Sequence, residues 1–306
     1  MTLGILCPGQ SAQAPDVIDR LRAAPEAAVV FDAFYQIMGS TVDAVLSEGR
    51  LHDNAIAQPL ICAVELAAFN AIKPSIPEPS YFAGYSIGEL AAYGCAGSIS
   101  AADTIRLASL RARLMDAVCA EPSGMIAIRG LRETTLAPIC ESNAVYIAIR
   151  NGDDRFVLAG PLRNMGSTTA DAERRGAHVT PLPVKIASHT PLMHPAVAAF
   201  AKALGNTEFK SPTAAVLAGI DGTSVRSRDM AVQRLSAQLE TRIDWQGCME
   251  SLKEAGCTTL LELLPGGDLS SMAKDRLLSV SSRSMIEFKS VDAAAAWVSR
   301  KEALSL

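Results

Sequence analysis

Short apolar runs alternate with stretches of helical periodicity along most of the chain. Residues 2–7 form an apolar run closed by Pro8-Gly9, which predicts a buried strand that ends in a turn. Residues 54–72 carry apolar side chains at helical spacing, and residues 81–84 and 258–263 are again typical of strands. Strands that alternate with helices favour a parallel sheet covered on both faces. We therefore expect an α/β fold with a large hydrolase-like domain, its parallel sheet flanked by helices.

Residues 121–185 have a different pattern from the rest of the chain. Strands are expected at residues 124–129, 144–149 and 155–159, with helices at residues 132–142 and 162–175. A β-α-β-β-α-β order suits a small ferredoxin-like α+β insert. We therefore predict a main α/β domain formed by residues 1–120 and 186–306, and a ferredoxin-like subdomain formed by residues 121–185.

Charge and hydropathy exclude several classes of function. The chain has 306 residues and a net charge of −4, and its basic residues are scattered, so the basic surface needed for nucleic-acid binding is missing. No apolar stretch reaches the roughly 18 residues of a membrane span. The first ten residues lack the basic start of a secretory signal. These features predict a cytoplasmic protein with neither nucleic-acid nor membrane partners.

The cysteines give no sign of a metal site. The chain has seven of them, with no C-x-x-C pair and no histidine at metal-ligand spacing. We expect free thiols in a reducing compartment and no bound metal.

Gly84-Tyr85-Ser86-Ile87-Gly88 has the G-x-S-x-G pattern of a nucleophile elbow. A serine on so sharp a turn between a strand and a helix has strained backbone angles, and glycines on either side let the two elements pass closely. The N–H of Ile87, at the start of the helix, would point at the oxygen of a tetrahedral intermediate. An ordinary structural turn is the alternative interpretation.

A serine hydroxyl needs a base to remove its proton at neutral pH. The chain has only four histidines to choose from: His52, His178, His189 and His194. Without further information, a core or helix-capping role is favoured for His189 over a catalytic one.

Several short motifs follow one another along the chain in a familiar order. They are Pro8-Gly9-Gln10, Gly84-Tyr85-Ser86-Ile87-Gly88-Glu89, Leu110-Arg111-Ala112-Arg113-Leu114-Met115, Ser188-His189-Thr190-Pro191-Leu192-Met193 and Leu263-Leu264-Pro265-Gly266. Their order and approximate spacing resemble those of the malonyl-CoA:acyl carrier protein transacylases across nearly the whole chain. The short chain and the Ser188-His189-Thr190 context most resemble the transacylase subunit of malonate decarboxylase.

The resemblance implies a role for individual residues. Ser86 and His189 would form a catalytic pair without a third carboxylate, the imidazole being oriented by backbone carbonyls. Arg111 would bind the free carboxylate of the malonyl group through a bidentate pair. Its alternative interpretation is a charge at the edge of an apolar helical stripe.

The resemblance also implies a supporting set of residues. The backbone N–H groups of Gln10 and Ile87 would form the oxyanion hole, although a glutamine after Pro-Gly is also ordinary turn chemistry. Gly84 and Gly88 would shape the turn, and Asn151 and Trp245 would support the site.

Four positions depart from patterns found in the family or in related polyketide acyltransferases. Ser11 stands where glycine is usual, and Tyr85 stands where histidine usually precedes the nucleophile. Ser188 replaces a phenylalanine common in malonyl-selective polyketide acyltransferases, which predicts a roomier pocket. Asp244 is aligned with a common late glutamine and would add negative charge near the site.

The resulting hypothesis is an acyl carrier protein S-malonyltransferase. A malonyl-type group would pass from its coenzyme A thioester, as substrate, through an ester on Ser86 to the pantetheine-type thiol of a carrier protein, with no permanently bound cofactor. One alternative is a serine esterase or thioesterase of the α/β-hydrolase type, which would have its histidine near the C-terminus and an H-G-G-type loop. Another is a non-catalytic subunit that only docks a carrier protein.

Overall fold

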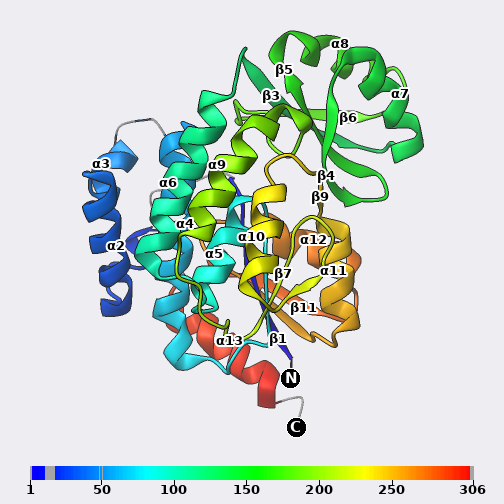
Figure 1. The fold of residues 1–306 in the computed structure, drawn as a ribbon. Helices are drawn as coiled ribbons and strands as arrows, with labels where there is room; N and C mark the ends of the chain where they lie inside the picture. The colour runs from blue at the N-terminus through cyan, green and yellow to red at the C-terminus, as the bar shows by residue number, and fades with distance from the viewer. Residues whose placement is uncertain (1, 11–17, 48, 50, 304–306) are drawn as a thin grey trace.

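The computed structural model describes residues 2–10, 18–47, 49 and 51–303 (Figure 1). The predicted departure at Ser11 lies outside the described residues. Two β-sheets organise the chain, a larger one in the lower part of Figure 1 and a smaller one at the top.

In the described part of the chain, the larger sheet has six strands in the order β11-β10-β1-β2-β7-β8. Their bounds are Leu3–Cys7 (β1), Tyr81–Gly84 (β2), Ala215–Leu217 (β7), Ser224–Val225 (β8), Thr259–Glu262 (β10) and Ser281–Ser284 (β11). Neighbouring strands are parallel except at the edge, where β8 runs antiparallel to β7. The predicted α/β class with a parallel sheet is therefore confirmed, with one antiparallel edge strand that the sequence pattern did not indicate.

Helices cover both faces of this sheet (Figure 1). They are α2 (Pro25–Met38), α3 (Val42–Ser47), α4 (Asn54–Ile72), α5 (Ile87–Cys95), α6 (Ala101–Ala117), α9 (His194–Gly205), α10 (Arg228–Ala237), α11 (Trp245–Glu254), α12 (Asp268–Arg276) and α13 (Val291–Ala303). Short 3-10 turns occupy Lys73–Ser75, Pro191–Met193 and Met285–Glu287.

Helix α4 lies in the core and corrects one expectation from the sequence. Residues 54–75 are long and apolar enough to cross a membrane by length and composition, contrary to the prediction that no stretch reaches that limit. In the structure, however, 83% of the most apolar window is buried inside the protein. The high hydropathy of this helix is explained by its contacts with α2, α5 and α6.

The smaller sheet, as described, has the strand order β6-β3-β5-β4-β9. Its strands are β3 (Ser123–Arg129), β4 (Tyr146–Gly152), β5 (Arg155–Pro161), β6 (His178–Leu182) and β9 (Ile243–Asp244), and its helices are α7 (Glu133–Asn143) and α8 (Leu162–Glu173). Strand β9 comes from a later part of the chain and pairs in parallel with β4. Residues 121–185 therefore do not make this sheet alone, and the ferredoxin-like subdomain with those boundaries stays a prediction.

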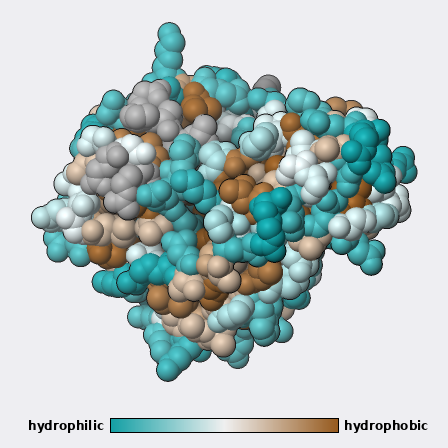
Figure 2. All heavy atoms as spheres, turned by 90° about the horizontal axis from the view of Figure 1, so that it is seen from above, coloured by the Kyte–Doolittle hydropathy of each residue, from teal (hydrophilic) through white to brown (hydrophobic). Residues whose placement is uncertain are grey.

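The two sheets meet where β1 and β2 end. Cys7 and Gly84, the last residues of these parallel strands, are paired neighbours. The loops that follow both strands therefore start side by side, facing the smaller sheet. Seen from that side, the surface is mostly hydrophilic, with smaller hydrophobic areas spread over it (Figure 2).

Candidate active site

Ser86 occupies the turn between β2 and α5. Its backbone has φ 57° and ψ −115°, a positive-φ conformation that is uncommon for a residue with a side chain. A Cβ on Gly84 would lie 2.1 Å from the nitrogen of Glu89, and one on Gly88 would lie 2.2 Å from the carbonyl oxygen of Cys7. Both glycines are thus required by close backbone contacts, as the elbow pattern predicts.

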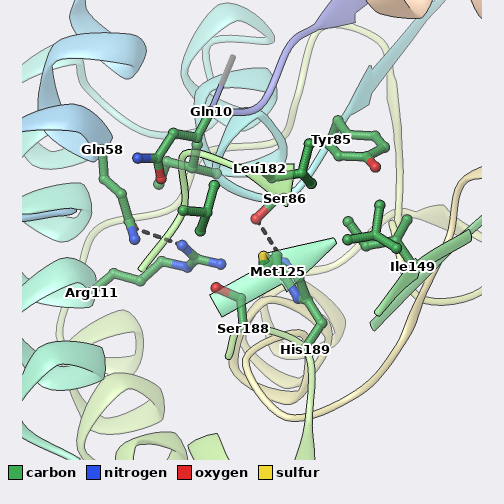
Figure 3. Close-up of a pocket in the computed structure, with 13 residues that line it drawn as sticks. Gln10, Gln58, Tyr85, Ser86, Arg111, Met125, Ile149, Leu182, Ser188 and His189 are labelled. Carbon is green, nitrogen blue, oxygen red and sulfur yellow. Dashed lines mark hydrogen bonds between the residues drawn. The ribbon is translucent and has the colours of Figure 1, made fainter. Parts of the chain in front are cut away.

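The Ser86 hydroxyl meets an imidazole. Its Oγ lies 2.7 Å from Nε2 of His189 (Figure 3). Nδ1 of the same ring lies 2.6 Å from the main-chain carbonyl oxygen of Gln238. A carbonyl can only accept a hydrogen bond, so Nδ1 carries the proton and Nε2 is left as the acceptor for the hydroxyl.

The environment of His189 keeps its ring neutral. Only 2% of the residue is exposed. Burial, and secondarily the charge of Arg111, lowers the pKa of His189 from its ordinary 6.5 to about 3. A neutral imidazole aimed at a hydroxyl has the form of a general base.

The other histidines lie apart from Ser86. His194 is exposed and pairs with Glu240 at 2.6 Å, and His178 is an exposed residue of β6. His52 lines a neighbouring cavity. Of the four candidates, the structure brings His189 to the serine.

Arg111 projects from α6 into the same cavity and is 3% exposed. Its Nη1 donates to Oε1 of Gln58 at 2.7 Å, and its Nη2 donates to Oε1 of Gln238 at 3.0 Å. Both acceptors are neutral amide oxygens, and burial lowers the pKa of Arg111 to about 10. A buried guanidinium held by neutral partners is a ready site for an anion.

Apolar side chains close the rest of the cavity. They come from the smaller sheet and the segment after it: Met125, Ile149, Val157, Leu182 and Val184. Ser188 also lines the cavity, immediately before His189 in the chain. Interactions between charges are stronger in such a water-poor space than at the surface.

Gln10 and Ile87 both line the cavity, beside Ser86. Ile87 is the first residue of α5, where backbone N–H groups have no partner within the helix. The Nε2 of the Gln10 side chain donates to the carbonyl oxygen of His52 at 3.4 Å. The oxyanion role of the two backbone groups stays a prediction.

Tyr85 stands at the position where histidine usually precedes the nucleophile. Its side chain packs against Trp245. Its ring stands edge-on to that of Trp245, with centroids 5.4 Å apart. Burial raises the pKa of Tyr85, and a hydrogen bond with Asn151 partly offsets this. Asn151 is therefore a neighbour of Tyr85 and not one of the cavity-lining residues, and its supporting role stays a prediction.

The structure corrects the expectation for Asp244. Its carboxylate forms a double contact with Arg150 at 2.9 and 2.6 Å and accepts from the backbone N–H of Gly247, so it caps α11. It does not line the cavity. The late glutamine at the site is Gln238, six residues earlier, where α10 ends.

Sequence reasoning also missed Gln58 and Gln238. Gln58 lies on α4 among apolar neighbours, and a buried polar residue on an apolar face was the available signal. Gln238 gave no such signal, because its contact with His189 uses a main-chain carbonyl that every residue possesses.

The fold and the site together define a serine enzyme, with a hydroxyl held against a neutral imidazole at a strand-to-helix turn. Residues 11–277 match the acyl transferase domain family. A malonyl CoA-acyl carrier protein transacylase of Mycobacterium tuberculosis (strain H37Rv) is 33% identical over 290 residues, 92% of this chain and 96% of that protein. The chain belongs to the acyl transferase family, among relatives that are malonyl CoA-acyl carrier protein transacylases.

Solved structures agree with this assignment. The crystal structure of the transacylase from Mycobacterium tuberculosis has a TM-score of 0.88 and 32% identity, and the match covers 97% of this chain and 100% of that one. A malonyl-transacylase in complex with its type II PKS acyl-carrier protein has a TM-score of 0.91 and 27% identity, with coverage of 97% and 99%. The narrower resemblance to a malonate decarboxylase subunit stays a prediction.

Proposed function

We propose that this protein transfers a malonyl group from coenzyme A to an acyl carrier protein through an ester on Ser86. One arrangement carries the proposal: a serine–imidazole pair opens into the same cavity as a buried arginine whose partners are neutral amides. The pair supplies a nucleophile, and the arginine supplies a site for the one feature that distinguishes malonyl from acetyl, its free carboxylate.

In the first half-reaction, Nε2 of His189 takes the proton of Ser86 while Oγ attacks the thioester carbon. The carbonyl oxygen becomes negative and accepts hydrogen bonds from the N–H groups of Ile87 and Gln10. The C–S bond then breaks, and the imidazolium returns its proton to the leaving thiolate. Malonyl-Ser86 and free coenzyme A result.

The second half-reaction runs the same steps in reverse with a different thiol. The pantetheine thiol of the carrier protein gives its proton to His189, and its sulfur attacks the ester carbon. The C–O bond to Ser86 breaks, and Oγ regains the proton. The malonyl group leaves as a thioester of the carrier protein.

Intact-mass measurement after mixing with malonyl-CoA tests the proposal. We expect one malonyl adduct on the wild type and none on Ser86→Ala, and the adduct should disappear when holo carrier protein is added. Parallel double-reciprocal lines for the two substrates should accompany it. Release of malonate to water at a comparable rate would identify an esterase instead, and a wild type that forms no adduct would indicate a docking subunit.

The proposed substrates also bear on the cellular location of the protein. Malonyl-CoA and a carrier protein are the partners in this proposal, and we propose a cytoplasmic location. The buried position of α4, the helix apolar enough to span a membrane, supports it.

A further inference from the structure

Glu89 is a fully buried carboxylate that the reaction steps do not use. It lies in the first turn of α5, three residues after Ser86, and none of its surface is exposed. Its Oε2 accepts from the backbone N–H of Gly219 at 2.9 Å and from Nε2 of Gln238 at 2.5 Å. A Cβ on Gly219 would lie 2.8 Å from the same oxygen, so the close approach depends on a glycine there.

The Gln238 side chain joins this carboxylate to the site. Besides its bond to Glu89, its Nε2 donates to the carbonyl oxygen of Ser86 at 3.1 Å. Its Oε1 accepts from Nη2 of Arg111 at 3.0 Å. The amide can therefore face the arginine in only one orientation: its nitrogen end must point at Glu89 and its oxygen end at Arg111.

We propose that Glu89 is a positioning residue for acyl-group selection: through the amide of Gln238 it fixes the Arg111 guanidinium that receives the substrate carboxylate. This inference rests on the proposed malonyl transfer and deepens it. Gln58 accepts a hydrogen bond from Nη1 of the guanidinium. Nη2 donates to Gln238, whose amide is in turn oriented by Glu89.

The indirect connection has a chemical reason. A carboxylate bonded directly to Arg111 would neutralise the positive charge that the malonyl carboxylate needs as its partner. With the Gln238 amide between them, Glu89 orients the guanidinium without a direct ion pair to it. Burial raises the pKa of Glu89 to about 7, against the effect of its two hydrogen bonds, so a hydrogen-bonding role that a neutral side chain can also perform fits its surroundings.

Two variants of Glu89 distinguish the effect of the position of its carboxylate from the effect of its charge. Glu89→Gln keeps the length of the side chain and an oxygen that accepts the same two hydrogen bonds, so its preference for malonyl-CoA over acetyl-CoA should stay within about 3-fold of the wild type. Glu89→Asp keeps the charge, but its side chain is one methylene shorter, so the carboxylate lies closer to the main chain of α5. Its preference should fall by up to about 10²-fold, the effect of misplacing a binding group by roughly 1 Å, mainly through a higher KM for malonyl-CoA.

A double-mutant cycle tests the route through Gln238. Glu89→Asp and Gln238→Ala should each reduce the preference, and the double variant should be no worse than Gln238→Ala alone. Glu65→Ala serves as the control, because Glu65 is also fully buried but belongs to α4 and has no bond to this network. That variant can change the melting temperature but should keep the malonyl preference.

The outcomes are distinct. A wild-type preference in Glu89→Asp, a loss in Glu89→Gln as large as in Glu89→Asp, or additive effects in the cycle would each overturn the inference while leaving malonyl transfer intact. A wild type that shows no preference for malonyl-CoA would overturn the proposed function together with the inference. The combination of a retained preference in Glu89→Gln, a lost one in Glu89→Asp and a non-additive cycle supports it.

Discussion

The main-chain carbonyl oxygen of Gln238 lies 2.6 Å from Nδ1 of His189, where a serine triad would have a carboxylate. A peptide carbonyl fixes the tautomer and the direction of the ring as a carboxylate does. It brings no charge, so it neither titrates nor stabilises an imidazolium by ion pairing. The serine therefore depends on a single titrating base in a buried setting.

Replacing His189 with alanine should lower the rate of Ser86 acylation by about 10² to 10⁴, the usual contribution of a general base. The Ser86 turn is held by backbone contacts of its own, so the fold should persist. Pre-steady-state mass spectrometry of the acyl-enzyme measures the rate, and circular dichroism checks the fold. Near-normal acylation would assign the base to another residue.

Replacing Arg111 with alanine should remove most malonyl transfer and raise relative activity on acetyl-CoA. The lost charge-assisted pair is worth roughly 2 to 5 kcal/mol, or about 30- to 5,000-fold in kcat/KM. Acetyl brings no anion to meet a buried guanidinium, so the wild type should reject it.

Arg113 provides the matched control for this experiment, since it lies on the same helix and is exposed. Arg113→Ala should change kcat/KM for either thioester very little. If Arg111→Ala keeps the malonyl preference, the carboxylate is bound elsewhere.

The pH dependence of Ser86 reactivity should report on His189. Because its pKa is lowered to about 3, the base stays neutral, and labelling by an uncharged fluorophosphonate should be nearly constant from pH 7 to about 5. Arg111→Ala removes the second cause of the lowered pKa, so the acid limb should move to higher pH. Arg113→Ala should leave it in place.

The same pKa has a consequence for stability. The unfolded chain binds a proton on this histidine near pH 6.5, whereas the folded chain does so only near 3. The contribution of neutral His189 to stability is therefore present above pH 6.5 and is lost as the pH falls toward 3. Denaturant titrations of the wild type and His189→Ala at pH 7 and pH 5 measure it. From pH 7 to pH 5, the free energy of unfolding should fall more for the wild type than for the variant.

Gly88→Ala should disrupt the Ser86 turn, because its Cβ would lie 2.2 Å from the carbonyl oxygen of Cys7. Forced overlap of this kind costs about 1 to 3 kcal/mol or more, and here backbone must move. We expect a lower melting temperature together with loss of fluorophosphonate labelling. Gly166 is the control: it lies inside α8 with nothing within 4 Å of its Cβ position, so Gly166→Ala should stabilise by about 0.5 to 1 kcal/mol.

The sequence could predict those features that are specified by residues close together in the chain. The Ser86 turn is specified by five consecutive residues, and the helix over residues 54–72 by its own periodicity, so both are found where they were expected. The partners of His189 and Arg111 could not be found in this way. They depend on where α10 ends, which places Gln238 rather than Asp244 at the site. Strand β9 is two residues long and leaves no periodic signal at all.

The cavity walls come from two separate parts of the chain. Met125, Ile149, Val157 and Leu182 belong to the smaller sheet, whereas Ser86 follows β2 of the larger sheet, and His189 is held by the main-chain carbonyls that follow α10. Mutations at these positions of the smaller sheet can therefore reshape the space around the acyl chain without displacing the atoms that break the thioester. For evolution, this separation lets substrate range drift while the chemistry is conserved. For protein engineering, it marks the cavity-lining positions of β3, β4, β5 and β6 as the place to randomise when a new acyl group is sought.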